Sequence, residues 1–166
     1  MENTIFDAVI VGAGVIGLAI AKHLSEEGLQ IVVLEKEKRS GESTSSRNSG
    51  VIHAGMYYPE NSLKAKLCVE GNNLLYHYAR KKNIPHKKIG KYIVSTSESE
   101  EKKLIQIYEN GKKNSVDLEI ISKTDLKEKL PYLSAVSGIF SPNTGIIDVP
   151  ELIKSLEFDI WQNDGL

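Results

Sequence analysis

The stretch Gly12-Ala13-Gly14-Val15-Ile16-Gly17 decides the fold of this 166-residue chain, because it reads G-x-G-x-x-G directly after an apolar run. In this motif the first glycine permits a tight turn, the second lets the backbone approach a pyrophosphate, and the third lets the next helix pack closely. The helix N-terminus offers free N–H groups and about half a positive charge to phosphates. The motif therefore predicts a phosphate-binding turn, with Val15 and Ile16 of the first helical turn among the contacts.

The residues on either side of the motif complete a β–α–β unit. Residues 6–11 form a short apolar run typical of a buried parallel strand, and residues 31–34 form a second one. Between them, residues 15–27 carry apolar side chains at helical spacing, and Gly28 stands where a helix C-cap is expected. Strand, helix and strand within about 30 residues predict a right-handed crossover between parallel strands.

An acidic residue follows the second strand. Glu35 is well placed to accept hydrogen bonds from ribose hydroxyls, and its charge would repel a 2′-phosphate, so NADP is disfavoured. Lys36 comes next and is included among the predicted cofactor contacts. These residues by themselves leave two ligands open, a nicotinamide dinucleotide and FAD.

The polar loop from Gly41 to Gly50 favours a flavin. A nicotinamide-dependent dehydrogenase would normally continue its sheet with another helix, whereas this chain enters a run of hydroxyl and amide side chains. Such short side chains and glycines suit a backbone folded closely around a large polar ligand, although an ordinary surface loop has a similar composition. Arg47 is placed to balance pyrophosphate charge. The predicted contacts in this loop are Ser45, Ser46, Arg47, Asn48, Ser49 and Gly50.

Further helices and strands follow the loop. A long helix is predicted over residues 63–82, with Ser62 as its N-cap and one apolar face formed by Leu63, Leu67, Leu74, Leu75 and Tyr78. Beyond Pro85 the composition shifts. Strands are predicted over residues 89–95, 118–121 and 138–141, a short helix over 124–130, and a charged helix from a Ser97–Glu100 capping box to about Lys113. The predicted class is α/β: a Rossmann-like β–α–β unit, then the start of a mixed α+β domain.

Composition argues against several classes of function. The chain has 21 basic and 22 acidic residues and a net charge of -1, which gives no reason to expect nucleic acid as a partner. Its single cysteine, Cys68, excludes an internal disulfide and suits a reducing compartment. No integral membrane segment is expected, because Lys22 and His23 interrupt the apolar N-terminal stretch. The histidines show no ligand spacing, so no metal site is expected. We expect a cytoplasmic protein, or one peripheral to the inner membrane.

Two long segments carry a family resemblance. They are G-E-S-T-S-S-R-N-S-G-V-I-H-A-G-M-Y-Y-P, Gly41–Pro59, and S-L-K-A-K-L-C-V-E-G, Ser62–Gly71. Both closely resemble the L-2-hydroxyglutarate oxidase/dehydrogenase family, which belongs to the FAD-dependent oxidoreductases related to D-amino-acid oxidase. The shorter pieces I-G-K-Y-I-V, Ile89–Val94, and S-P-N-T-G-I-I-D, Ser141–Asp148, resemble it too.

The resemblance implies a cofactor, a reaction and partners. The implied cofactor is FAD. The implied substrate is a small 2-hydroxyacid, (S)-2-hydroxyglutarate, which would be oxidised to 2-oxoglutarate with hydride transfer to flavin N5. The electrons would then pass to a quinone or another acceptor. Another flavin oxidase, such as a glycine oxidase or a glycerol-3-phosphate dehydrogenase, stays open as an alternative, and so does a non-catalytic fragment.

His53 is the candidate catalytic residue, since it is the one histidine in the first quoted segment. Oxidation of an alcohol requires removal of the hydroxyl proton as hydride leaves, and a neutral imidazole can accept a proton near pH 7. A lone histidine is more often structural, so both roles stay open. Tyr57 and Tyr58 are candidates to orient a carboxylate, with packing as the alternative.

The resemblance also implies a domain organisation. Residues 1–85 would belong to the FAD-binding domain, residues 86–148 to a partial substrate domain, and residues 149–166 to chain returning toward the FAD-binding domain. Members of the family are much longer. We therefore expect the chain to be the N-terminal part of such an enzyme and to be inactive by itself.

Overall fold

The computed structural model describes residues 5–166 and divides them into two compact units. The first unit contains residues 5–50, 79–85 and 147–166, and the second contains residues 51–78 and 86–146. The chain passes from one unit to the other four times: after Gly50, after Tyr78 inside helix α2 (Leu63–Lys81), after Pro85 and after Ile146.

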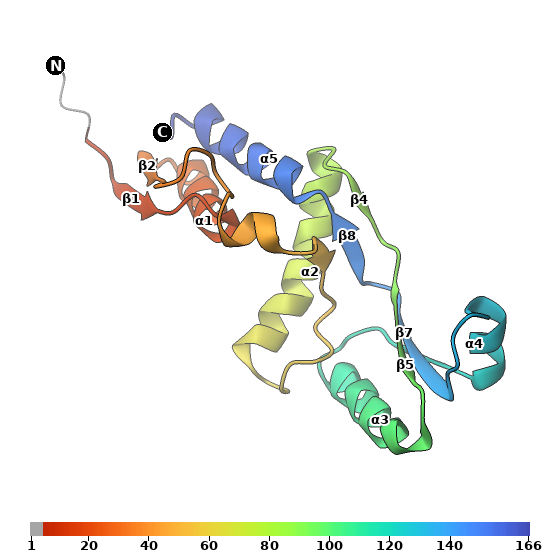
Figure 1. The fold of residues 1–166 in the computed structure, drawn as a ribbon. Coiled ribbons are helices and arrows are strands. Elements are labelled where there is room, and N and C mark those ends of the chain that lie inside the picture. Colours follow the sequence, from red (N-terminus) through yellow and green to blue (C-terminus); the bar gives the residue numbers. More distant parts are fainter. Residues whose placement is uncertain (1–4) are drawn as a thin grey trace. The chain divides into compact units, whose positions relative to one another are not determined.

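The first unit begins with the predicted β–α–β arrangement (Figure 1). Strands β1 (Ala8–Val11) and β2 (Ile31–Leu34) pair in parallel, with Ala8 opposite Ile31, and α1 (Val15–Glu26) connects them. The turn at Gly12 has φ +102°, a conformation that L side chains rarely adopt. Gly28 ends the crossover with φ +86° and donates its N–H to Ser25 O at 3.0 Å. The predicted β–α–β arrangement is confirmed, but the prediction that both strands are buried is wrong, because Val9, Val11 and Leu34 are more than half exposed.

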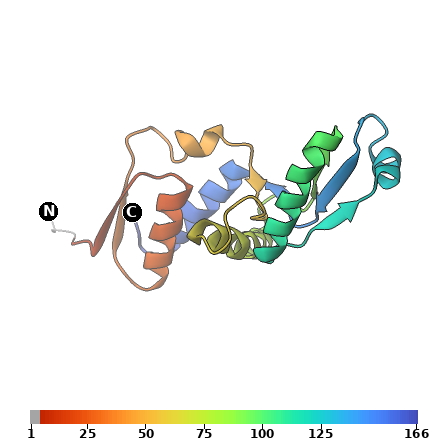
Figure 2. The same ribbon diagram turned by 90° about the horizontal axis from the view of Figure 1, so that it is seen from below.

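Helix α5 (Val149–Gln162), an element missing from the sequence prediction, packs beside α1 (Figures 1 and 2). The side chain of Asp148 caps it by accepting the Glu151 N–H at 3.0 Å. Its buried apolar side chains are Leu152, Ile153, Leu156 and Ile160. Beyond the helix, Leu166 N donates to Ile31 O at 2.9 Å and Leu166 O accepts from Val33 N at 2.7 Å. This is the parallel-strand pattern, so the backbone of Leu166 joins the sheet beside β2.

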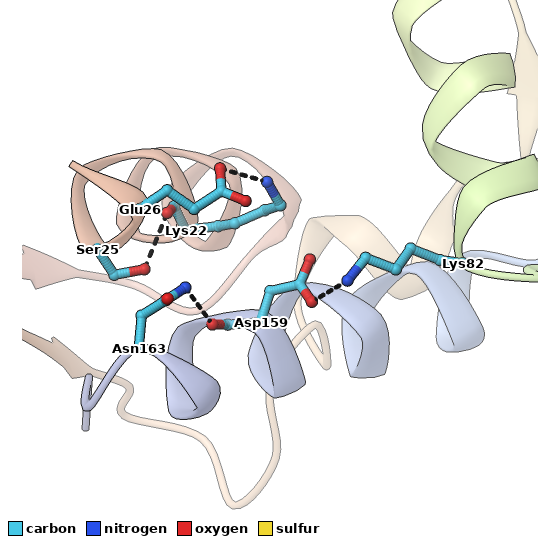
Figure 3. Close-up of polar contacts among 6 residues, drawn as sticks. All are labelled: Lys22, Ser25, Glu26, Lys82, Asp159 and Asn163. Atoms are coloured by element: carbon cyan, nitrogen blue, oxygen red, sulfur yellow. Dashed lines mark hydrogen bonds and ion pairs between the residues drawn. The ribbon is translucent and has the colours of Figure 1, made fainter. Parts of the chain in front are cut away.

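A polar contact holds segment 79–85 against α5 (Figure 3). Lys82 forms an ion pair with Asp159, whose side chain is only 7% exposed. The backbone O of Asp159 also accepts the Asn163 side-chain N–H at 2.9 Å. Because an uncompensated charge is costly at a buried position, the Lys82 ammonium stabilises the Asp159 carboxylate. The nearby Lys22–Glu26 pair, at 2.6 Å along α1, is exposed and contributes little to stability.

The second unit is built on antiparallel pairing. Short strands β3 (Val51–Ile52), β8 (Gly145–Ile147) and β4 (His86–Lys87) lie in the order β3-β8-β4. A larger sheet has the order β5-β7-β6, formed by β5 (Lys91–Ser95), β7 (Ser137–Ser141) and β6 (Glu119–Ile121). Helix α3 (Glu98–Lys113) packs against β5 and β7, and α4 (Lys123–Lys129) against β7 (Figure 2). The core beneath α3 consists of Ala54, Met56, Leu104, Val116, Leu118 and Ile139.

The predicted buried face of α2 is wrong. Leu63, Leu67 and Leu74 are 71%, 56% and 61% exposed, and Leu75 and Tyr78 are half-buried. The buried side instead carries Ala65, Asn72, Tyr76 and Ala79. Its polar members explain the difference, because the Asn72 amide and the Tyr76 hydroxyl both donate to Asn143 O, at 2.9 Å and 3.3 Å. A rule that counts apolar side chains misses a face that is held by hydrogen bonds.

The predicted capping box at α3 is confirmed only in its Glu100 half, since the Glu100 carboxylate interacts with the Ser97 backbone N–H, and the helix limits are close to those expected. Ser97 Oγ lies 2.9 Å from Ser99 Oγ and does not cap the helix. The Glu100 carboxylate reaches one residue further back and accepts from Thr96 N at 2.8 Å and Thr96 Oγ1 at 2.9 Å. By contrast, Ser62 does cap α2, since its Oγ accepts the Ala65 N–H at 3.1 Å.

Candidate cofactor site

The three glycines of the turn meet three different physical requirements. Gly12 supplies a left-handed backbone, and Gly17 supplies close packing, since a Cβ there would lie 2.0 Å from Gly12 O. A Cβ on Gly14 would meet only Ser45 Oγ, at 3.3 Å. The space in front of Gly14 is therefore open toward the N-terminus of α1, where a phosphate is favoured by N–H groups and by the helix dipole.

Glu35 connects the end of β2 to the glycine turn. One carboxylate oxygen accepts from Ala13 N at 2.7 Å, and the other accepts from Lys36 N at 2.8 Å and Glu37 N at 3.0 Å. The N–H groups of Glu37 and then Ala13 lower the pKa of Glu35, so it is ionised at neutral pH. Sequence analysis predicted a ribose contact for Glu35 and missed this second role, because a contact across 22 residues leaves no local signal.

The polar loop turns back onto the glycine turn through η1 (Thr44–Arg47). Ser45 is buried, and its Oγ accepts the Val15 N–H at 3.1 Å. Gly41 N donates to Ala13 O at 2.9 Å. Asn48 stabilises the exit of the loop by accepting the Gly50 N–H at 2.8 Å and donating to Ser45 O. The loop is therefore anchored to α1 by specific hydrogen bonds.

These elements enclose a cleft of about 360 Å³ within the first unit. From the predicted set, Gly12, Gly14, Glu35, Lys36 and Ser45 line it. Gly41, Ser43 and Thr44 line it as well, although they were not predicted. The sequence signal that could have identified these three residues as cleft lining is their place in the same polar loop.

The other predicted contacts have different surroundings. Ile16 is 74% exposed, and Val15 presents its N–H to Ser45. Ser46, Arg47, Asn48 and Ser49 are exposed, with the Ser46 hydroxyl donating to Glu42 O at 2.8 Å. Gly50 has φ +64° and accepts the Ile147 N–H at 2.9 Å. Their role as cofactor contacts stays a prediction.

The cleft has the donor set that the ADP half of a dinucleotide requires. It combines the N-cap residue of α1, open space at Gly14 and a carboxylate where a ribose would lie. Glu35 is the one acidic residue among the described residues that line it. The residues present therefore fit FAD through its pyrophosphate and ribose.

The second unit contains His53, which directly follows β3 and has an exposed side chain. Its backbone O accepts from Asn72 Nδ2 at 3.0 Å and faces Cys68 Sγ at 3.7 Å. Burial raises the pKa of the Cys68 thiol, with Lys64 opposing the shift, so the thiol is protonated at neutral pH. The imidazole of His53 therefore projects from a backbone that is fixed by its neighbours.

Asparagines hold the loop that follows His53. Asn110 Nδ2 donates to Met56 O and Tyr58 O, both at 2.8 Å. Asn114 Nδ2 donates to Gly55 O at 3.2 Å and to Tyr58 O at 2.8 Å. Both asparagines lie at the C-terminal end of α3, so a helix more than 50 residues away fixes the path of the loop.

The part of the chain that the structure describes contains neither a cluster of metal-ligating side chains nor a helix able to span a membrane. Over residues 5–166 no group of three His, Cys, Asp or Glu side chains is arranged to hold a metal ion. Over the same residues no helix has the length and apolar character needed to cross a membrane.

A glycine turn, a helix N-terminus and an acidic residue around one cleft define a dinucleotide-binding protein of the Rossmann type. The model of one family, DAO or FAD-dependent oxidoreductase, matches residues 7–160. The chain belongs to this family. FAD is the cofactor of the family, so the nicotinamide alternative is dropped and the predicted cofactor and fold class are confirmed.

Curated relatives cover nearly the whole chain. It is 46% identical over 165 residues to an L-2-hydroxyglutarate dehydrogenase of Arabidopsis thaliana, 49% identical over 163 residues to that of Nematostella vectensis and 44% identical over 163 residues to that of Homo sapiens. Each match covers 96% of this chain but 34%, 36% and 35% of the relative. The chain thus spans about a third of the length of these relatives, at their N-terminal part.

Solved structures share the fold. The L-α-glycerophosphate oxidase of Mycoplasma pneumoniae, determined with FAD bound, matches with a TM-score of 0.90 and 31% identity. That match covers 96% of this chain and 43% of the oxidase. The glycine oxidase of Geobacillus kaustophilus matches with a TM-score of 0.85 over 97% of this chain and 45% of its own, at 22% identity, which shows the fold alone.

Proposed function

We propose that these residues form the N-terminal portion of an FAD-dependent oxidoreductase that oxidises (S)-2-hydroxyglutarate to 2-oxoglutarate. The observation that carries the proposal is the identity of 44–49% with proteins named L-2-hydroxyglutarate dehydrogenase, over 96% of the chain. The fold and the cofactor-shaped cleft agree with it, since an oxidoreductase acting on a small molecule needs both.

The cofactor contacts are proposed from the geometry of the cleft. The N–H groups at the start of α1, with Val15 and Ile16, would bind the pyrophosphate in front of Gly14, and Glu35 would accept hydrogen bonds from ribose. Glu35 can do so while it holds Ala13, because a carboxylate has about four acceptor positions. The segment from Ser45 to Gly50 would extend along the pyrophosphate and flavin. When bound, FAD supplies the acceptor for the hydride that leaves the substrate α-carbon.

His53 is proposed as the general base. Conversion of the alcohol to a ketone removes a hydride from carbon and a proton from oxygen, and the proton needs an acceptor near neutral pH. An exposed imidazole on a hydrogen-bonded backbone can accept it without moving the chain.

Substitution of His53 tests this role. In the FAD-loaded protein, His53→Asn should retain flavin and slow flavin reduction by (S)-2-hydroxyglutarate by roughly 100-fold, measured as stopped-flow bleaching. His77→Asn, which changes an exposed histidine of α2, is the matched control and should reduce at the wild-type rate. Wild-type reduction by the His53 variant would place the base elsewhere.

The glycerophosphate oxidase match supports a second candidate, oxidation of glycerol 3-phosphate, which is also a secondary alcohol with an anionic group. A substrate panel separates the two. We expect (S)-2-hydroxyglutarate to bleach the flavin, and glycerol 3-phosphate and glycine to leave it oxidised. The reverse pattern would replace the proposed substrate.

Domain roles, electron acceptor and location complete the proposal. We assign residues 1–85 to the FAD-binding domain, residues 86–148 to the substrate domain and residues 149–166 to chain returning toward the FAD-binding domain. We propose a quinone as electron acceptor and a site in the cytoplasm or at the inner-membrane surface. Reduction of a soluble quinone analogue during turnover tests the acceptor, and fractionation of cells tests the location.

A further inference from the structure

We propose that Lys91 binds the distal carboxylate of a dicarboxylate substrate at the mouth of a small hollow, about 10 Å³ in volume, that Lys91 and His53 both line. The identity of the substrate rests on the proposed function, whereas the site itself rests on contacts inside the second unit.

The hollow, here called the His53–Lys91 hollow, is lined by side chains that suit an anion. Its polar members are His53, Tyr57, Tyr58, Lys91 and Thr144. Together they offer an imidazole, two phenols, an ammonium and a hydroxyl, all of which can donate hydrogen bonds. None of the described residues that line the hollow is acidic. An ammonium among neutral donors is the composition expected of a carboxylate site.

The backbone of Lys91 is fixed at the start of β5. Lys91 pairs with Ser141 of β7, and Gly90 before it has φ +71°. A Cβ on Gly90 would lie 2.3 Å from the ring of Phe140, and Gly90 N donates to Thr144 O at 2.9 Å. The turn into β5 therefore tolerates no side chain before Lys91, and it sets where the Lys91 side chain begins.

The Lys91 ammonium faces an aromatic ring and has no acidic partner. Its Nζ lies 4.8 Å from the centroid of the Tyr57 ring. Among the described residues, no carboxylate lies within ion-pair distance of it. A cation–π contact at an open site is worth about 0.5–1 kcal/mol, less than a charge-assisted hydrogen bond to a carboxylate. An incoming carboxylate would therefore bind an ammonium whose charge no carboxylate of the described residues neutralises.

Hydrogen bonds hold the backbone of the loop that carries His53, Tyr57 and Tyr58. Tyr57 lies between Met56 and Tyr58, whose carbonyls are both held by Asn110, and Asn114 holds Tyr58 again. Asn72 holds the carbonyl of His53. Because these hydrogen bonds fix the loop before ligand arrives, binding requires little ordering, and the preorganised site favours affinity.

This arrangement matches the chemistry of 2-hydroxyglutarate. One end of that molecule carries the hydroxyl on which His53 would act, and the other end carries a second carboxylate. A cation in the hollow that contains the base would hold the distal carboxylate and thereby position the hydroxyl. It would also discriminate against hydroxyacids that have a methyl group in place of the distal carboxylate.

Lys64 provides a matched control. Its Nζ lies 4.6 Å from the centroid of the Tyr58 ring, so it makes the same kind of contact with the neighbouring tyrosine. It lies at the start of α2 and does not line the hollow. Lys64→Met therefore removes a cation that contacts the same loop without removing one from the proposed site.

The test is calorimetric titration of the FAD-loaded full-length protein with glutarate and with pentanoate, which replaces one carboxylate by a methyl group. Lys91→Met should weaken glutarate binding about 10- to 100-fold and leave pentanoate binding within about 2-fold. Lys64→Met should change neither. The same pattern should hold for kcat/KM with (S)-2-hydroxyglutarate against (S)-2-hydroxypentanoate. If Lys91→Met does not fold, Lys91→Gln takes its place.

The outcomes separate this inference from the proposed function. Glutarate that binds no more tightly than pentanoate to the wild type overturns the inference, as does equal glutarate affinity of the wild type and the Lys91 variant. Equal losses for glutarate and pentanoate also overturn it, because they indicate general damage. Glutarate binding that depends on Lys91, in a protein that does not oxidise (S)-2-hydroxyglutarate, rejects the proposed function and retains the dicarboxylate site.

Discussion

Gly17→Ala should destabilise the protein far more than Gly14→Ala, although both glycines belong to one motif. A Cβ on Gly17 would lie 2.0 Å from Gly12 O, against about 3.4 Å for an ordinary contact. Helix α1 would have to move by roughly 1.4 Å to relieve the overlap. That movement strains the hydrogen bonds Gly12 N to Leu34 O, at 2.7 Å, and Ala13 N to Glu35, also at 2.7 Å.

The expected magnitude follows from these two effects. Overpacking costs about 1–3 kcal/mol and a weakened hydrogen bond about 1 kcal/mol, so we expect a loss of about 2–4 kcal/mol for Gly17→Ala. At Gly14 the new Cβ meets only the Ser45 hydroxyl, at 3.3 Å, and the local φ of -77° suits alanine. We therefore expect Gly14→Ala to cost less than about 1 kcal/mol of folding stability.

Urea denaturation of the flavin-free protein measures the stability change, and flavin fluorescence measures the affinity for FAD. Gly14→Ala should fold normally and bind FAD more weakly, because its Cβ enters the space proposed for the pyrophosphate. Equal stabilities for the two variants would refute the packing argument for Gly17. Unchanged FAD affinity in Gly14→Ala would refute the placement of the phosphates.

Three further predictions follow from the first unit. Glu35→Gln should weaken FAD binding. N–H groups lower the pKa of Glu35, so its contribution to stability should be complete above pH 4.5, the ordinary pKa of a glutamate. That contribution should be lost as the pH falls through the lowered pKa. The melting temperatures of Glu35→Gln and wild type should therefore converge in acid. Lys82→Met should cost about 3 kcal/mol by removing the ammonium paired with the buried Asp159 carboxylate, and the double variant Lys82→Met/Asp159→Leu should recover most of it, as chemical denaturation can show. The 166 residues expressed by themselves should aggregate, because the strand residues Val9, Val11 and Leu34 are 54%, 85% and 53% exposed. Any protein recovered should carry no flavin. A soluble, yellow, active product would contradict this prediction.

Two helices differ from what the sequence pattern predicted. Helix α5 was missed although its signals were local: Asp148 as N-cap, Pro150 in the first turn, and Leu152, Leu156 and Ile160 at helical spacing. The buried face of α2 was assigned wrongly for a different reason. Its face is selected by the hydrogen bonds of Asn72 and Tyr76 to Asn143, a residue about seventy positions further along the chain.

What the sequence by itself determined is the β–α–β unit and its chemistry. Gly12, Gly14 and Gly17 meet conformational and steric requirements that arise within a few residues, and strand β2 at Ile31–Leu34 was predicted with its exact limits. Such features are readable because backbone dihedral preferences and side-chain periodicity are local properties of the chain. The polar loop and Glu35 were recognised in the same way, from residue type and position relative to the strands.

What only the tertiary structure decided is which side chains meet. Glu35 holds Ala13, Asn110 and Asn114 hold the loop beyond His53, and Lys91 lies over Tyr57. Each of these contacts joins residues that are more than twenty positions apart, and each depends on how strands and helices are packed within a unit. Periodicity specifies which face of an element is apolar, but it holds no information about the partner that a polar side chain finds across the fold. The cleft and the hollow therefore exist only once the chain has folded.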